Sequence, residues 1–235
     1  MLNGIHGHQD IERVVYGKPA GAALRAEAER LGAKRVFITT TKSVAQSALL
    51  ADVIRDLGDR YAGVYASITA HSPRPCVIEG AALAREAKAD LIVAVGGGSA
   101  IDATKVMLIA LWQNATRIED LDLYRAGKPK EGAAPPAEAI KPPADAIRML
   151  AVPTTLSAAE FNAFAGITDP RHGIKESFGH RLVVTRPPKP QGLGIIEAEA
   201  VAIVPAQPAF SRKGLESRLV EQHAAGKDIG LDEIG

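Results

Sequence analysis

The stretch from Val93 to Lys105, VAVGGGSAIDATK, constrains the fold more than any other part of this chain. An apolar run, Leu91 to Val95, meets three consecutive glycines, and Ser99 then begins a segment with helical spacing. Glycines at such a junction allow the backbone amides at a helix N-terminus to approach a phosphate closely. The spacing matches neither GxGxxG nor the GxxxxGK[ST] pattern of a P-loop. The alternative is a strand-to-helix turn that uses glycine for its geometry alone.

The composition is that of a globular protein without a strong electrostatic field. Of 235 residues, 46% are hydrophobic and 23% charged, and the net charge is +1, so we expect neither a nucleic-acid nor a membrane partner. No apolar run approaches the roughly 18 residues of a membrane span, and the first residues lack the apolar core of a signal peptide. We therefore expect a cytoplasmic protein. The single cysteine, Cys76, excludes an internal disulfide and is expected to pack as a small hydrophobic side chain.

In the first half of the chain, short apolar runs alternate with longer helical patterns. Strands are predicted at Arg13–Tyr16, Val36–Thr40, Gly63–Ile68 and Leu91–Val95, and helices at Ala20–Leu31, Ser43–Leu57, Cys76–Lys88 and from Ser99 to about Leu111. Repeated strand and helix units predict an α/β fold, a Rossmann-like doubly wound parallel sheet with helices on both faces. Ligands of such sheets bind at the carboxyl ends of the strands, where the glycines lie.

The second half is less regular. Residues 113–146 are rich in proline, alanine and charge, which indicates an exposed insertion or linker. A short strand is predicted at Met149–Val152, directly before the sequence PTTLSAAE. Further strands are predicted at Ala163–Thr168 and Arg181–Thr185, which would form a hairpin around the turn sequence DPRHG.

Several polar residues near the glycines have a purely structural interpretation. Ser99 and Asp102 match the S-x-x-[DE] pattern of a helix cap. Lys105 follows Asp102 by one helical turn and could pair with it on a helix surface.

The same holds for the second motif. Thr154, Thr155 and Ser157 could form a turn and an N-cap, with Glu160 at the start of a helix. His71 lies in a predicted turn, where histidine is more often exposed to solvent than functional. These residues point to a site only in combination.

That combination resembles a known family. GGGSAIDATK, followed by PTTLSAAE from Pro153 and then by GITD and IKE, is similar to the iron-containing alcohol dehydrogenase superfamily. The GGGSxxDxxK and PTTxxxxE forms favour its alcohol dehydrogenase and maleylacetate reductase branches. The resemblance extends from about Val14 to about Leu182. Two details, the short spacing within PTTLSAAE and a histidine at His71, favour the maleylacetate reductase side.

The resemblance implies an N-terminal dinucleotide-binding domain followed by an all-helical domain that carries iron or zinc. It implies a cofactor, NAD(P), and cofactor-binding positions on this chain, whereas no catalytic residue is assigned. The implied positions are His71, Gly96, Gly97, Gly98, Ser99, Asp102, Thr154, Thr155, Ser157 and Lys175. Glycines with serine would hold the pyrophosphate, and the threonine pair would contact phosphate and the nicotinamide side.

The choice between NAD and NADP depends on the end of the second predicted strand. Enzymes that select NAD commonly place an acidic residue there, which binds the ribose hydroxyls and repels a 2′-phosphate. Here the segment is Thr39 to Lys42, without a carboxylate, and Thr41 is the candidate cofactor contact. Both cofactors therefore stay open.

The resemblance stops after the predicted hairpin. The family's metal is held by an aspartate in a DP step and by helix-borne histidines, but no aspartate occurs between Asp169 and Asp228, and one histidine follows His180. The ligand set is thus not present in this chain, and we expect no metal site. We divide the chain into a dinucleotide-binding domain, 1–186, with the insertion at 113–146, and an atypical tail, 187–235. We expect a truncated form that lacks the helical domain and whose tail arises from a shifted reading frame, a misjoined exon or a rearranged gene.

The sequence therefore predicts an NAD(P)-dependent oxidoreductase. It would transfer a hydride between nicotinamide and an alcohol or carbonyl, or an unsaturated keto acid similar to maleylacetate. The alternative is a nucleotide-binding module or pseudoenzyme without metal chemistry. A small-molecule substrate and a homodimer are expected, the latter because the missing helices would leave an apolar face uncovered.

Overall fold

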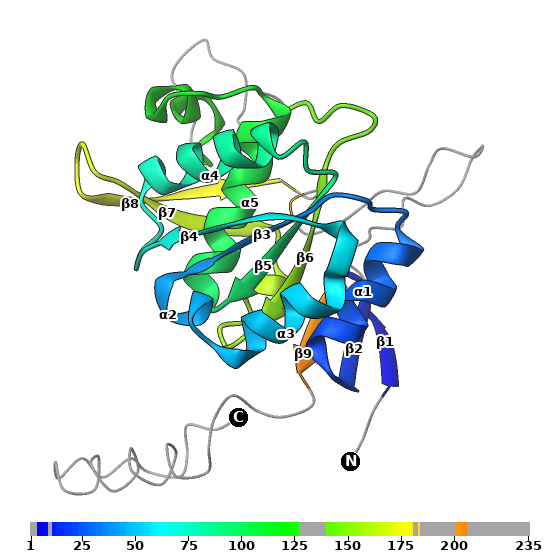
Figure 1. Ribbon diagram of the computed structural model, residues 1–235. Helices are drawn as coiled ribbons and strands as arrows, with labels where there is room; N and C mark the ends of the chain where they lie inside the picture. The colour runs from blue at the N-terminus through cyan, green and yellow to red at the C-terminus, as the bar shows by residue number, and fades with distance from the viewer. Residues whose placement is uncertain (1–3, 9–10, 127–139, 181–182, 184–200, 206–235) are drawn as a thin grey trace, which may run out of the picture.

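The computed structural model describes residues 4–8, 11–126, 140–180, 183 and 201–205. A central sheet lies between two layers of helices (Figure 1). The seven strands of this sheet are β1 (Gly4–His8), β2 (Ile11–Lys18), β3 (Val36–Thr41), β4 (Tyr61–Ile68), β5 (Leu91–Gly96), β6 (Arg148–Pro153) and β9 (Val201–Pro205). Their order across the sheet is β1-β2-β9-β6-β5-β3-β4. All neighbouring pairs are parallel except β1 and β2, so the predicted parallel sheet is confirmed and gains one antiparallel edge strand.

The helices cover both faces of the sheet, as predicted. They are α1 (Ala20–Arg30), α2 (Lys42–Ala45), α3 (Ala48–Leu57), α4 (Arg74–Glu86) and α5 (Gly98–Trp112), with short 3-10 turns η1 (Gly58–Arg60), η2 (Ile118–Tyr124) and η3 (Ala159–Phe161). In β5, Ile92 and Ala94 pack into the core that contains α4 and α5, whereas Leu91, Val93 and Val95 pack into the core with α1 and α3. Every residue of β5 is buried, as expected for a central parallel strand.

Helix α5 is the most buried helix of the fold. Its residues from Ala103 to Ala110 are all buried, because it lies between the sheet on one side and α4 and the β7–β8 hairpin on the others (Figure 1). Within the part of the chain that the structure describes, neither α5 nor another helix has the length and apolarity to cross a bilayer.

A two-stranded antiparallel hairpin, β7 (Phe164–Asp169) and β8 (Ile174–Gly179), packs against α5. The turn sequence DPRHG was located correctly, and Gly173 has the positive φ, 64°, that such a turn favours. The predicted return strand was wrong: it is Ile174–Gly179, not Arg181–Thr185, of which only residue 183 is described.

Two further predictions are corrected. The single helix Ser43–Leu57 is two helices, because Ser47 accepts a hydrogen bond from Leu50 N at 3.3 Å and begins α3 anew. The 113–146 segment is not wholly exposed, since Ala115, Leu121 and Ile140 are buried in the core beside α5. These apolar positions are too far apart in sequence to form a recognisable pattern.

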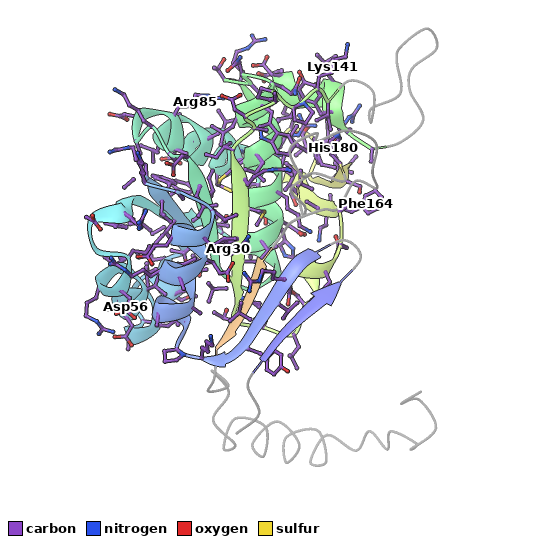
Figure 2. The ribbon with its side chains drawn as sticks, turned by 90° about the vertical axis from the view of Figure 1, so that its right-hand side faces the viewer. Arg30, Asp56, Arg85, Lys141, Phe164 and His180 are labelled. Atoms are coloured by element: carbon purple, nitrogen blue, oxygen red, sulfur yellow. The ribbon has the colours of Figure 1, made fainter. Side chains whose placement is uncertain are left out.

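The strand β9 was not predicted. It lies between β2 and β6, within the sheet, and comes from the segment that we assigned to the tail. Figure 2 shows β9 beside the β1 and β2 strands at this side of the sheet. The sheet therefore takes one strand from beyond residue 186. The rest of 187–235 lies outside the described residues, and the domain boundary remains a prediction.

Candidate functional site

The glycine stretch and the PTT sequence meet at the carboxyl edge of the sheet. They follow the neighbouring strands β5 and β6, which are paired from Leu91–Arg148 to Gly96–Pro153. Thr154 N donates a hydrogen bond to Gly96 O at 3.0 Å. A Cβ atom at Gly97 would lie 2.9 Å from both Oγ1 and Cγ2 of Thr155, too close for any side chain. The two motifs thus share one turn region, and glycine is required at Gly97 by close approach.

The helix α5 begins in this region without a side-chain cap. Its N-cap residue is Gly97, and no acidic residue lies in its first turn. The predicted cap by Ser99 and Asp102 is wrong, because Asp102 Oδ2 instead accepts a hydrogen bond from Gly166 N in β7 at 3.1 Å. The first amides of a helix have no intrahelical partner and carry partial positive charge, so this end of α5 favours an anion.

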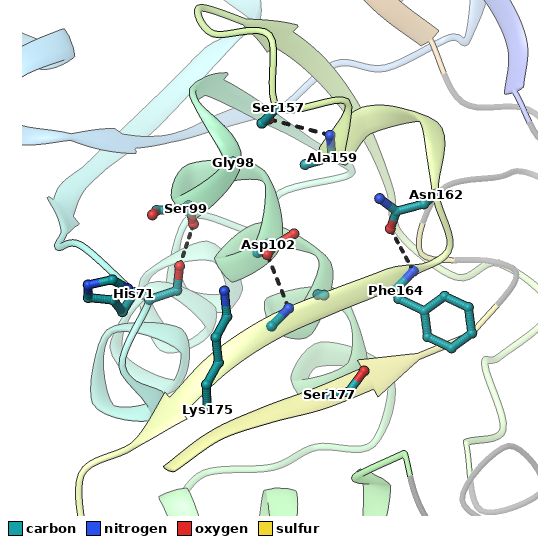
Figure 3. Close-up of a pocket in the computed structure, with 13 residues that line it drawn as sticks. His71, Gly98, Ser99, Asp102, Ser157, Ala159, Asn162, Phe164, Lys175 and Ser177 are labelled. Carbon is teal, nitrogen blue, oxygen red and sulfur yellow. Dashed lines mark hydrogen bonds between the residues drawn. The ribbon is translucent and has the colours of Figure 1, made fainter. Parts of the chain in front are cut away.

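A cavity of about 540 Å³ opens beside the start of α5 (Figure 3). Its lining residues are His71, Ser72, Gly98, Ser99, Asp102, Ser157, Ala159, Asn162, Phe164, Ala165, Gly166, Lys175 and Ser177. Six predicted positions are among them, namely His71, Gly98, Ser99, Asp102, Ser157 and Lys175. Gly96, Gly97, Thr154 and Thr155 form the adjoining turn but do not line this cavity.

Thr41 lies apart from the cavity lining. It ends β3, the neighbour of β5, and therefore lies on the same edge of the sheet. Its Oγ1 accepts a hydrogen bond from Val44 N at 3.4 Å and lies 3.1 Å from Ser43 Oγ, so it caps α2. The predicted role of Thr41 in cofactor contact stays a prediction.

Lys175 reaches the cavity by crossing the hairpin. Its side chain extends from β8 toward α5 and lies between His71 and Asp102 (Figure 3). A Cβ atom at Gly166 of β7 would lie 2.4 Å from Lys175 Cε and 3.1 Å from its Nζ. Glycine at this position therefore makes room for the lysine side chain, and the exposed Nζ supplies a positive charge opposite the helix start.

The loop that carries His71 is held in an unusual conformation. His71 and Ser72 both have positive φ, 62° and 48°, which costs free energy for residues other than glycine. Contacts to two neighbours compensate: Ser72 Oγ donates to Ser99 O at 2.7 Å, and Thr168 Oγ1 donates to His71 O at 3.0 Å. The His71 side chain is exposed, as expected for a turn residue, but it lines the cavity.

Lys105 is not on a helix surface. Only 1% of it is exposed, and its Nζ donates to the carbonyl oxygens of Ala159, Asn162 and Phe164. Burial lowers the pKa of Lys105 to about 8, although Asp102 and Glu160 oppose that shift. The lysine thereby fixes the path of the chain from η3 into β7, along one wall of the cavity.

Two carboxyl groups beside Lys105 have raised pKa values. Burial is the main cause for both Asp102 and Glu160, and Lys105 acts in the opposite direction on each. Glu160 is not an exposed helix-start residue: it is buried in η3, and its Oε2 has no hydrogen-bond partner. A raised pKa makes Asp102 a better proton acceptor in a cavity than an ordinary aspartate.

Sequence reasoning missed part of the cavity wall. Ser72, Asn162, Gly166 and Ser177 line it but belong to no stretch that we singled out as binding. Gly166 alone had a usable signal, since it lies in the GITD sequence that the family resemblance already included.

The residues present fit a dinucleotide better than a metal. The uncapped helix start, the glycine that a Cβ would block and the nearby lysine suit a diphosphate. Among the described residues, no three His, Cys, Asp or Glu side chains lie close enough to hold a metal ion.

Comparison with known proteins identifies a family for this chain. The family model "Iron-containing alcohol dehydrogenase" matches residues 12–186. Dehydrogenase FUM7 of Gibberella moniliformis is 33% identical over 168 residues, which cover 69% of this chain and 38% of that protein. Maleylacetate reductase 2 of Cupriavidus pinatubonensis is 40% identical over 108 residues, 46% of this chain and 30% of that protein. The chain thus spans well under half the length of these relatives.

Solved structures share the fold. Sulfoacetaldehyde reductase from Bifidobacterium kashiwanohense, in complex with NAD+, aligns with a TM-score of 0.65 at 21% identity, over 87% of this chain and 46% of that one. Maleylacetate reductase from Agrobacterium tumefaciens aligns with a TM-score of 0.56 at 20% identity, over 86% and 43%. Because the family model covers most of the sheet, both motifs and the hairpin, this chain belongs to the iron-containing alcohol dehydrogenase family.

Proposed function

We propose that this chain binds a nicotinamide dinucleotide, NAD(P), at the carboxyl edge of its sheet. The observation that carries the proposal is the close approach of Gly97 to Thr155 at the uncapped start of α5. The pyrophosphate would bind at this helix start, and the nicotinamide end would enter the cavity lined by Asp102 and Lys175. Family membership and the NAD+ bound to a structural neighbour support the assignment.

The proposed activity is that of an oxidoreductase. Nicotinamide, when bound, donates or accepts a hydride at its C4. Ser99 and Gly98 would orient the nucleotide through backbone amides, and Lys175 would supply a positive charge beside the cavity. The maleylacetate reductases among the relatives support an alcohol, a carbonyl or an unsaturated keto acid as the small-molecule substrate.

The choice between NAD and NADP depends on the residues that would lie near the ribose of the nucleotide. Thr41 and Ser43 offer hydroxyl groups after β3, and Lys42 between them is exposed. No carboxylate is present in this segment to repel a 2′-phosphate. We therefore propose NAD(P) and compare the two cofactors directly in the test.

Fluorescence titration of the full chain with NADH and with NADPH tests the proposal. At least one of them should bind with a Kd in the micromolar range, and Gly97→Asp should weaken that binding about a hundredfold, since it adds bulk and negative charge at the helix start. Gly32→Asn is the matched control, because Gly32 has φ 70° and open space around it. Equal binding by the Gly97→Asp and Gly32→Asn variants would contradict a pyrophosphate site at this glycine.

A second candidate function is nucleotide binding without dehydrogenase chemistry. It is favoured because, among the described residues, no three His, Cys, Asp or Glu side chains lie close enough to hold a metal ion, and because one histidine follows His180. An assay for NAD(P)-dependent alcohol oxidation and maleylacetate reduction, with added iron or zinc, separates the candidates. Turnover would reject this second candidate, and binding without turnover would reject activity of the chain by itself.

A further inference from the structure

Arg74, the first residue of α4, is completely buried and takes part in no motif of the proposed site. Its Nη1 donates to Asp122 Oδ1 at 2.6 Å, and its Nε and Nη2 donate to Glu176 Oε2 at 3.0 and 2.5 Å. The Asp169 carboxylate lies 3.7 Å from Nε. Three carboxylates from η2, β7 and β8 thus surround one guanidinium, which connects α4 to both strands of the hairpin.

The contact with Glu176 determines which way β8 faces. Side chains alternate along a strand, so neighbours of Glu176 point to the opposite side. Lys175 and Ser177 line the cavity, whereas Glu176 is turned toward Arg74, and the buried Phe178 ring lies with its centroid 5.7 Å from the Arg74 guanidinium carbon. Holding Glu176 therefore holds Lys175 in the cavity.

Arg74 also follows closely, in sequence, the loop of His71 and Ser72, which lines the cavity. The preceding Pro73 forms a β-bridge with Thr168 of β7, and Thr168 N donates to Ser72 O at 3.2 Å. Ser72 in turn donates to Ser99 O, at the start of α5. The loop that presents His71 is thus joined to β7 and to α5, and Arg74, two residues after Ser72, joins it to β8 through Glu176.

Stability alone is a weak explanation for this arrangement. Removing an arginine and several carboxylates from water costs free energy, and apolar packing of the same volume often serves stability as well or better. Two guanidinium N–H groups that donate to the same Glu176 oxygen fix direction, which an apolar contact does not. We propose that Arg74 is a positioning residue for nucleotide binding, which aims Lys175 at the cavity by holding Glu176 behind β8. This inference rests on the proposed function.

The experiment is a double-mutant cycle between Arg74→Lys and Lys175→Ala in the full chain. Lysine keeps the charge at position 74 but cannot donate from two fixed N–H groups to Glu176. NADH and NADPH dissociation constants are measured by fluorescence, and melting temperatures confirm that each variant is folded. Arg85→Lys is the matched control, because Arg85 lies on the same helix and donates to Ala110 O and Ala115 O without touching β8.

Arg74→Lys should raise the Kd for the nucleotide about fivefold. The Kd of the Arg85→Lys variant should stay within about twofold of that of the unsubstituted chain. In the Lys175→Ala background, Arg74→Lys should have no further effect, because the lysine through which it acts is gone. If Arg74→Lys does not fold, Glu176→Gln takes its place in the same cycle. The positioning role is overturned if the effect persists at full size without Lys175, or if Arg74→Lys and Arg85→Lys bind equally well. Failure of the unsubstituted chain to bind either nucleotide would instead refute the proposed function, and the inference with it.

Discussion

On one side of the cavity, at the start of α5 and the Thr154–Ser157 turn, backbone and small side chains are in direct contact. The opposite side, the β7–β8 hairpin, is fixed by buried charges. Gly97 and Gly98 lie against Thr155 and Ser157 with no room for a Cβ atom at Gly97. On the hairpin side, the guanidinium of Arg74 is surrounded by carboxylates and is not exposed at all.

The difference follows from what each side has to do. In the proposed function, backbone amides at the helix start bind a phosphate, and side chains there would only obstruct it. A charged side chain such as Lys175 has to be directed across β7 from a two-stranded hairpin, which is marginally stable by itself. Buried ion pairs supply the missing rigidity, although their desolvation is costly.

The largest expected effect is the loss of stability caused by Arg74→Met, which disrupts the buried charges on the hairpin side. Removal of the guanidinium leaves Glu176 with Arg125 and Asp169 with Arg171, but it takes away buried charge-assisted hydrogen bonds, at a cost of about 2–3 kcal/mol in the free energy of unfolding. Urea denaturation measures that cost. Arg55→Met, which removes an exposed ion pair on α3, should have little effect. A loss below about 1 kcal/mol for Arg74→Met would show that the hairpin does not depend on the charge cluster.

Titration should distinguish the two sides, because the pKa of Asp169 in the hairpin and that of Asp102 in α5 are shifted in opposite directions. Hydrogen bonds from Arg171 hold the pKa of Asp169 far below its ordinary value, whereas burial raises the pKa of Asp102 on α5. Carboxyl ¹³C NMR should therefore give Asp169 a midpoint below 3.8 and Asp102 one above it. Asp169→Asn and Asp102→Asn identify the two signals.

The same shifts have opposite consequences for stability. The contribution of Asp169 is fully present above its unfolded pKa and is lost as the pH falls through its lower native pKa. Asp102 binds its proton more tightly in the native state, so its ionisation costs stability as the pH rises through its native pKa. Acid unfolding of the Asp169→Asn variant should thus be less steep than that of the unsubstituted chain; an unchanged slope would argue against a paired Asp169.

The smallest expected effect is that of Gly166→Ala on nucleotide affinity. The new Cβ would meet Lys175 Cε, the flexible end of a side chain, so the hairpin should fold while the lysine moves away from Asp102. NADH or NADPH titration should show about a threefold rise in Kd. Gly179→Ala is the matched control on the same hairpin, because its Cβ would meet the Phe164 ring, which lies well away from Lys175 in Figure 3 and at the outer surface in Figure 2. A larger loss of affinity for Gly179→Ala would contradict this account of Gly166.

Local patterns predicted one side of the cavity and not the other. Gly96–Ser99 and Thr154–Ser157 each follow a buried strand, and parallel strands bring such ends together. The hairpin was misplaced because the true return strand, IKESFG, has polar and charged residues where the apolar sequence LVVT had seemed the better strand. Its buried side faces an ion cluster, so its pattern is not that of an apolar core.

Arg74 had no signal in the sequence at all. An arginine at a helix start is ordinarily a solvated surface residue, and its partners Asp122 and Glu176 lie 48 and 102 residues farther along the chain. The strand β9 was missed for a related reason: five residues within a segment of prolines and glycines form a strand only because β2 and β6 stand on either side of them.

The sequence by itself determined the alternation of strands and helices, the edge of the sheet at which the two motifs lie and the family, because these depend on periodicity and on short contiguous motifs. Only the tertiary structure decided that Lys105 is buried under carbonyl oxygens, that Asp102 bonds the hairpin rather than capping its helix and that Lys175 faces the cavity. Those outcomes depend on contacts between residues far apart in the chain, whose hydrogen bonds and burial no local pattern encodes.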